Sequence, residues 1–205
     1  PIMSLYIKNA RFIDWQALDI TDTHIIVEEG GEGGIQLTAD MPDATGPDDR
    51  VFDAENRFVT KSFACGHHHI YSTLARGMPA PAKTPEDFTQ ILEYVWWNVD
   101  KNLDMEMIKA SALASAIYCA RNGVTFVIDH HASPHAVQGS LFTIKEAFDT
   151  VGISHLLCYE MSDRDGPKIA RAGLDETADY LNAGHPGHVG LHASFTVGDE
   201  LLSKA

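Results

Sequence analysis

The sequence predicts an α/β protein in which a parallel sheet follows an N-terminal β segment. Two observations predict this class. Up to about residue 57, short β-rich runs are separated by Gly and Pro turns, as in an all-β segment. From residue 58 onward, strand-like runs alternate with helix-like runs, which is typical of βα units on a parallel sheet. We therefore divide the chain into a β segment, 1–57, and a βα segment, 58–205.

The β segment contains three expected strands: Leu5 to Phe12, His24 to Glu28 and Ile35 to Leu37. Residues 29–34, which read Glu-Gly-Gly-Glu-Gly-Gly, and residues 41–50 are expected to be turns or loops, because Gly and Pro interrupt regular structure. The segment holds 12 acidic and 4 basic residues and no cluster that resembles a catalytic site. We expect its acidic side chains to form a solvated surface.

The βα segment alternates expected strands with expected helices. The strands are Phe58 to Gly66, Val124 to Asp129, Ile153 to Glu160 and Val189 to Phe195. The helices are Glu86 to Asp100, Asp104 to Arg121, Leu141 to Thr150 and Lys168 to Leu181, and a further helix starts at Asp199 or Glu200. The second helix has a mostly apolar face, and Asn122-Gly123 supplies its C-terminal stop.

Composition excludes several classes of partner. The chain has 15 basic against 29 acidic residues, a net charge of −14, so it lacks the clustered Lys and Arg that nucleic-acid binding needs. It has no apolar run of the ~20 residues that a bilayer span requires and no N-terminal signal pattern. Its three cysteines are odd in number and far apart in sequence, which favours a reducing compartment over a disulfide framework. We expect a cytoplasmic protein that binds neither nucleic acid nor membrane.

Histidine is the unusual residue, with 11 copies, and most of them fall in three groups. The first group is His67-His68-His69, at the end of the first βα strand. Because alternate residues of a strand point to the same side, His67 and His69 can bind one ion while His68 points away. Such a pair suits Zn²⁺ or Fe²⁺. The alternative is a polar strand end whose histidines only form hydrogen bonds.

The other two groups follow later strands, whose carboxyl ends share one rim of a βα fold. Asp129-His130-His131 could supply a wall for a substrate, an extra metal ligand or structural hydrogen bonds, and the strand alternation leaves open which side chain faces the site. His192 is either a site residue or a satisfied structural histidine. The Trp96-Trp97 pair is expected in the core. The sequence has no glycine-rich phosphate loop and no G-x-S-x-G elbow.

Several segments together resemble one known family, in the family's order. They are Cys65 to Ser72 with Leu74 to Gly77, Trp96-Trp97 with Asp100, Gly123 to Thr125 with Val127 to Pro134, and Gly190 to Thr196. On these segments the chain resembles the amidohydrolase superfamily, within it the chlorohydrolase and deaminase branch, and is most similar to aminohydrolases of the SsnA type. The family usually has Pro-Gly where this chain has Lys61-Ser62, a departure that concerns the local turn before the strand end and not the expected metal ligands.

The resemblance implies the N-terminal half of a (β/α)₈ TIM barrel of the metal-dependent hydrolase type, preceded by part of a small β-sandwich. It implies one divalent metal, Zn or Fe, bound by His67 and His69 together with a histidine from the fifth strand and an aspartate from the eighth. His192 corresponds to a substrate-contacting histidine. We expect His130 and His131 to contact substrate as well.

The implied reaction uses metal-activated hydroxide to hydrolyse a C–N or C–Cl bond of an aminated heterocycle, in a protein that forms a homo-oligomer at full length. An amidase or cyclic-imide hydrolase of the same superfamily is one alternative, and a non-enzymatic metal-binding half-barrel is another. A barrel takes about 250 residues, whereas the 148 residues after residue 57 suffice for roughly four to five units. We therefore expect the catalytic proton-transfer groups beyond Ala205, and we expect the 205 residues alone to be inactive.

Overall fold

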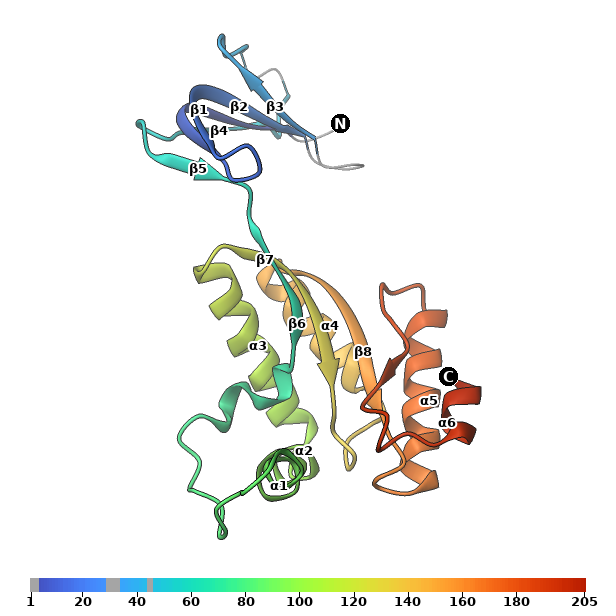
Figure 1. Ribbon diagram of the computed structural model, residues 1–205. Coiled ribbons are helices and arrows are strands. Elements are labelled where there is room, and N and C mark those ends of the chain that lie inside the picture. The colour runs from blue at the N-terminus through green and yellow to red at the C-terminus, as the bar shows by residue number, and fades with distance from the viewer. Residues whose placement is uncertain (1–3, 29–33, 44–45) are drawn as a thin grey trace. The chain divides into compact units, whose positions relative to one another are not determined.

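The computed structural model describes residues 4–28, 34–43 and 46–205, which form two compact units divided between Lys61 and Ser62 (Figure 1). The glycine turn expected over residues 29–34 lies, apart from Gly34, outside the described residues, as do residues 44 and 45 of the loop expected over 41–50. None of the described helices is both long and apolar enough to cross a bilayer.

The first unit is a five-stranded sheet around β1. Its strands are β1 (Ser4–Asp14), β2 (Asp19–Glu28), β3 (Ile35–Thr38), β4 (Arg50–Asp53) and β5 (Phe58–Thr60). β1 and β2 form an antiparallel hairpin that β3 extends, while β4 and β5 run parallel to β1. Phe12 and Ile25 are buried in the small core on this sheet. The three strands expected in this segment are confirmed, and β4 is a short strand that the sequence did not indicate.

The strand expected from Phe58 to Gly66 is wrong, because the structure divides it between the two units. β5 pairs with β1 in the first unit, ending where Thr60 lies opposite Ile13. β6 (Phe63–His68) pairs with β7 in the second unit, starting where Phe63 lies opposite Val124. The β-rich pattern of this run does not by itself reveal that its two halves join different sheets.

The second unit carries a parallel sheet in the order β6-β7-β8-β9. Its other strands are β7 (Val124–His131), β8 (Ser154–Met161) and β9 (Gly190–Leu191), and its longer helices are α3 (Met105–Arg121), α4 (Ser140–Val151) and α5 (Pro167–Asn182). Each strand lies beside the next one in sequence, and Figure 1 shows the sheet curling with the helices along one face. The predicted α/β class with a parallel sheet is confirmed.

Local signals explain where the helices begin and end. Asp104 caps α3 by accepting a hydrogen bond from the Met107 amide at 2.8 Å. After α4, Gly152 adopts a φ of 85°, a left-handed conformation that glycine takes without strain. The N-terminus of α4 is capped from another helix: Glu176 of α5 is buried and accepts hydrogen bonds from the amides of Gly139, at 2.6 Å, and Leu141, at 2.9 Å.

Three elements differ from expectation near the strand ends. The helix expected from Glu86 to Asp100 is α1 (Phe88–Ile91), a π-helical turn η2 (Leu92–Trp96) and α2 (Trp97–Lys101). A 3₁₀ turn, η1 (Ile70–Ala75), follows β6, where no helix was expected. The helix expected to start at Asp199 or Glu200 is α6 (Asp199–Lys204) and agrees with the prediction. The fourth strand, expected from Val189 to Phe195, is only β9, because the Thr196 amide bonds back to the Ala193 carbonyl at 3.0 Å and turns the chain.

Candidate functional site

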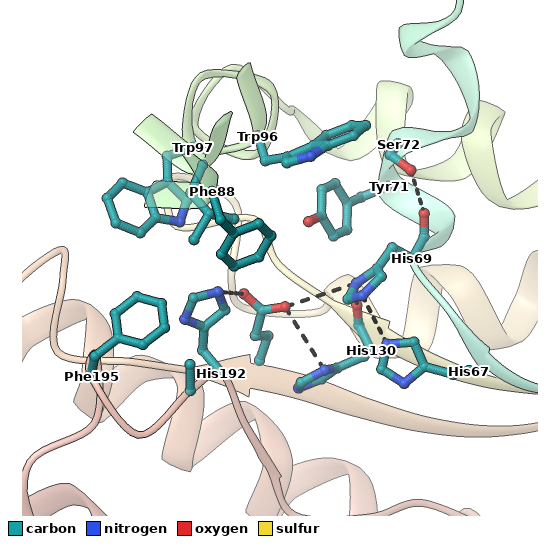
Figure 2. A pocket seen from close by; sticks show the side chains of 13 residues that line it. His67, His69, Tyr71, Ser72, Phe88, Trp96, Trp97, His130, His192 and Phe195 are labelled. Carbon is teal, nitrogen blue, oxygen red and sulfur yellow. Dashed lines mark hydrogen bonds and ion pairs between the residues drawn. The ribbon is translucent and has the colours of Figure 1, made fainter. Parts of the chain in front are cut away.

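The carboxyl ends of the four parallel strands meet at one pocket of about 380 Å³ (Figure 2). β6 contributes His67, and His69 follows directly after the end of β6. β7 contributes His130 and β8 contributes Glu160. His192 follows β9 directly. The complete lining is His67, His69, Tyr71, Ser72, Phe88, Leu92, Trp96, Trp97, His130, Glu160, His192, Ala193 and Phe195.

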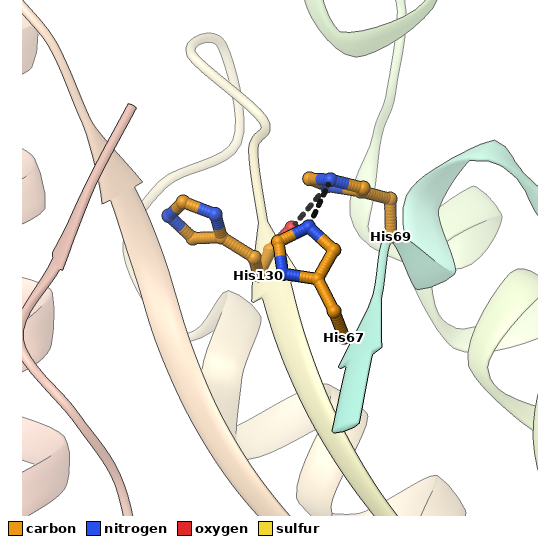
Figure 3. Close-up of side chains that lie close together, drawn as sticks. All are labelled: His67, His69 and His130. Atoms are coloured by element: carbon orange, nitrogen blue, oxygen red, sulfur yellow. Dashed lines mark hydrogen bonds between the residues drawn. The ribbon is translucent and has the colours of Figure 1, made fainter. Parts of the chain in front are cut away.

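Three of these histidines form a cluster that can hold a metal ion. Ligand nitrogens of His67, His69 and His130 all lie within 4.8 Å of one another (Figure 3). Nε2 of His67 is 3.0 Å from Nε2 of His69. Two imidazole nitrogens on one tetrahedral Zn²⁺, each bound at about 2.0–2.1 Å, lie about 3.3 Å apart. The pair therefore needs little movement to bind one ion.

A backbone carbonyl fixes the tautomer of His69. Its Nδ1 donates a hydrogen bond to the His130 carbonyl oxygen at 2.9 Å. A neutral imidazole carries one N–H, so the lone pair of His69 is on Nε2, the nitrogen that faces His67. Metal-binding histidines in proteins commonly have their second nitrogen held in this way. The donor chemistry of the pair thus fits a divalent metal.

At the end of β7, the structure shows which of Asp129, His130 and His131 faces the site, a question that the sequence left open. His130 faces the pocket. Asp129 and His131 point to the other side of the strand and are fully buried there. Asp129 Oδ1 accepts a hydrogen bond from the Ile70 amide at 2.7 Å.

His131 is held away from the pocket by its own contacts. Its Nε2 lies 2.9 Å from Ser133 Oγ, and its ring lies 6.0 Å from the rings of Tyr71 and Tyr159. The expectation that His131 contacts substrate together with His130 is therefore corrected, because adjacent residues of a strand face opposite sides. His68 likewise points away from His67 and His69, and its Nδ1 lies 4.0 Å from Asp129 Oδ1.

His192 reaches the pocket from the turn after β9. Its Nδ1 lies 2.6 Å from Thr196 Oγ1, and its Nε2 points toward Glu160, 3.6 Å from Oε1. Burial lowers the pKa of His192, and Arg164 lowers it further. Burial, followed by the charges of neighbouring histidines, lowers the pKa of His130 to about 4. Neutral imidazoles at these positions can bind a metal or accept a hydrogen bond.

Glu160 is the site residue that sequence reasoning missed. Burial raises the pKa of its carboxyl to about 8, an effect that the charge of Arg164 reduces. Oε2 lies 3.8 Å from His130 Nδ1 and 3.9 Å from His69 Nδ1. A carboxylate at the carboxyl end of an otherwise apolar strand was the available signal, since this is where βα folds build their sites.

Aromatic rings form the wall opposite the histidines. Trp96, Trp97 and Phe195 stand around the space that His69 and His192 enter (Figure 2). The ring of His192 lies 6.4 Å from that of Trp97 and 6.0 Å from that of Phe195. The Trp pair therefore lines the pocket, although the sequence placed it in the core. A flat ring with polar edges fits between such walls.

No protein-family model matches the chain. Among solved structures, a triazine hydrolase from Arthobacter aurescens matches with a TM-score of 0.79 at 16% identity, over 98% of this chain and 49% of that one. The likeness establishes the fold. An atrazine chlorohydrolase from Arthrobacter aurescens complexed with zinc and atraton gives a TM-score of 0.78 at 16% identity, with coverages of 98% and 49%. Guanine deaminase from C. acetobutylicum with bound guanine gives 0.67 at 16% identity, with coverages of 100% and 49%.

These matches confirm the predicted fold class. The curled parallel sheet of the second unit corresponds to half of the barrel in these hydrolases, and the chain spans about half the length of the structures it matches. All of the named neighbours act on or bind small nitrogen heterocycles.

Proposed function

We propose that the protein containing this chain is a metal-dependent amidohydrolase that hydrolyses a C–N or C–Cl bond of an aminated heterocycle. The observation that carries the proposal is the pair His67 and His69, whose Nε2 atoms face each other at 3.0 Å at the rim of an aromatic pocket. The fold shared with deaminases and a chlorohydrolase supports it. The narrower likeness to aminohydrolases of the SsnA type is part of the same proposal.

His67 and His69 would hold Zn²⁺ or Fe²⁺, with His130 as the adjoining nitrogen. A divalent metal, when bound, activates water for attack on an sp² carbon. The chain's own groups then position the substrate. His192 is oriented by Thr196 and presents Nε2 to the pocket, while the aromatic wall stacks on the ring and excludes water.

Metal analysis of the dialysed protein tests the first half of the proposal. We expect stoichiometric zinc in the whole protein and loss of most of it when that protein carries His67→Ala. His188→Ala, which removes an exposed histidine of the same chain, is the matched control and should retain the metal. Equal zinc in wild type and His67→Ala would overturn the proposed metal site.

Ammonia release from a panel of aminated pyrimidines, purines and triazines, together with chloride release from chlorinated aminotriazines, tests the second half. We expect turnover by the whole protein, and none by the 205 residues alone, because they match half the length of the enzymes that share the fold. Hydrolysis of amides or cyclic imides instead would favour the amidase alternative. Tight metal binding by a whole protein that hydrolyses nothing in either panel would favour a non-enzymatic metal-binding role.

Two further expectations belong to this proposal. The three cysteines are free, which fits a reducing, cytoplasmic location. We also propose that the full-length protein forms a homo-oligomer, which sedimentation analysis of that protein tests directly.

A further inference from the structure

Glu160 is a buried carboxyl group that has no hydrogen-bonding partner among the described residues, although it lines the pocket. The residue is 6% exposed. The nearest nitrogens to its oxygens belong to His192, His130 and His69, at 3.6, 3.8 and 3.9 Å. These distances exceed the about 2.7–3.2 Å of an N–H···O hydrogen bond. A buried carboxyl without such bonds is costly, so its geometry calls for a donor from a ligand.

Two of the three neighbouring histidines already have other partners. His69 uses its Nδ1–H on the His130 carbonyl, and His192 Nδ1 contacts Thr196 Oγ1. An ionised carboxylate is an acceptor with two oxygens and can take two parallel N–H groups at once. Aromatic rings form the wall of the pocket and favour a flat ligand that stacks on them while its edge reaches Glu160.

We propose that Glu160 is a specificity-determining residue that accepts two N–H bonds from one edge of the ligand, a ring N–H and the exocyclic amino group beside it. The inference rests on the proposed function, since it names the class of heterocycle that this pocket takes: rings with an adjacent donor–donor edge. Two donated hydrogen bonds favour the ionised carboxylate, and so does a cation at the histidine pair, against the effect of burial.

The main alternative is that Glu160 only holds His130 and His192 in place. In that case its removal would weaken all ligands alike. If Glu160 instead accepts hydrogen bonds from the donor–donor edge, its removal weakens the binding only of ligands that carry that edge. A pair of probes that differ by one amino group therefore separates the two roles.

The probes are 2-aminopyrimidin-4-one, which has the donor–donor edge, and pyrimidin-4-one, which lacks the amino group. Equilibrium dialysis with the zinc-loaded chain measures both affinities. We expect the wild-type chain to bind the amino compound at least ten-fold more tightly, because the amino group donates a second hydrogen bond to a charged acceptor. Glu160→Gln should reduce that preference to about two-fold or less, whereas Glu106→Gln, an exposed change on α3, should keep it.

The wild-type comparison needs no variant, so it remains decisive even if Glu160→Gln does not fold. Equal affinity for the two probes, or binding of neither, overturns the inference. A preference that survives in folded Glu160→Gln also overturns it. A protein that binds no zinc but still prefers the amino probe would contradict the proposed function and support this inference. A protein that binds zinc but shows no preference between the probes would contradict this inference and leave the proposed function unaffected.

Discussion

Nη2 of Arg164 lies 2.5 Å from Oδ2 of Asp100, and both side chains are almost fully buried. Arg164 follows β8, and Asp100 is in α2, so the pair ties the loop after β8 to the helix that carries the pocket's aromatic wall. The guanidinium also lies over the indole of Trp97, 5.2 Å from its ring centre. The buried ion pair of Arg164 and Asp100 therefore contacts Trp97, a residue that lines the pocket.

Arg164→Met should lower the free energy of unfolding of the second unit by about 3–5 kcal/mol, because it leaves Asp100 buried without its partner. Burial already raises the pKa of Asp100, and the nearby Arg164 counteracts this. Urea unfolding measures the loss, and near-UV circular dichroism should show a changed environment of Trp97.

Lys101→Met is the matched control for this prediction. Lys101 pairs with Asp165 at 2.8 Å but is 37% exposed, so its loss should cost no more than about 1 kcal/mol. Combining Arg164→Met with Asp100→Leu should recover much of the stability, since replacing both buried charges by apolar groups removes the unpaired one. Equal losses in the Arg164 and Lys101 variants would contradict a buried role for the Arg164 pair.

The two neighbouring histidines of β7 should have opposite mutant phenotypes. His130→Ala should reduce zinc affinity by ten-fold or more and leave the unfolding free energy nearly unchanged, because His130 faces the pocket. His131→Ala should cost about 2–4 kcal/mol, because it opens a cavity between buried rings, and should keep full zinc content in the folded fraction. Zinc analysis and urea unfolding of both variants check this, and the reverse pattern would show that the sides of the strand are assigned wrongly.

The sequence could predict the strand ends that build the site but not which side chains reach it. His67 and His69 follow from strand alternation, since residues two apart share a face. For Asp129, His130 and His131 the same rule gives two equivalent answers, and only the pairing of β7 with both neighbours decides between them. The sequence overestimates the length of β9, because strand propensity does not reveal the turn in which the Thr196 amide bonds back to the Ala193 carbonyl.

The role of Glu160 could not be predicted from its local sequence either. In sequence it is one acidic residue at the end of an apolar strand, where a charged end is ordinary. Its place in the site depends on three other segments, whose histidines bring a ring nitrogen within 4 Å of the Glu160 carboxyl oxygens: His69, His130 and His192. No local periodicity encodes such a convergence.

Glu176→Ala should destabilise the second unit by about 1–3 kcal/mol, because the amides of Gly139 and Leu141 would lose their buried acceptor. Chemical denaturation gives the magnitude. Glu146→Ala, which removes an exposed glutamate of α4, should change stability by less than about 0.5 kcal/mol. If the two variants were equally stable, the cap from α5 would contribute nothing to α4.

The stability of the metal-free protein should depend on pH through Glu160. Burial raises the pKa of this carboxyl to about 8, above the usual glutamate value of about 4.5. Between these values the folded state holds a proton that the unfolded state has lost, so the contribution of Glu160 to the free energy of unfolding falls as pH rises from about 4.5 to about 8. Glu160→Gln cannot titrate and should lack this part of the slope.

The measurement is urea unfolding of the chelator-treated wild type and Glu160→Gln at several values between pH 5 and pH 8. Asp129, whose pKa burial also raises to about 8, is present in both proteins, so its own titration is common to the two curves, although its charge also helps to raise the pKa of Glu160. We therefore expect the variant to gain stability relative to wild type as pH rises, while Glu106→Gln follows the wild type. Parallel curves for wild type and Glu160→Gln would mean that the carboxyl titrates normally, and that water or a flexible neighbour reaches it in the metal-free pocket.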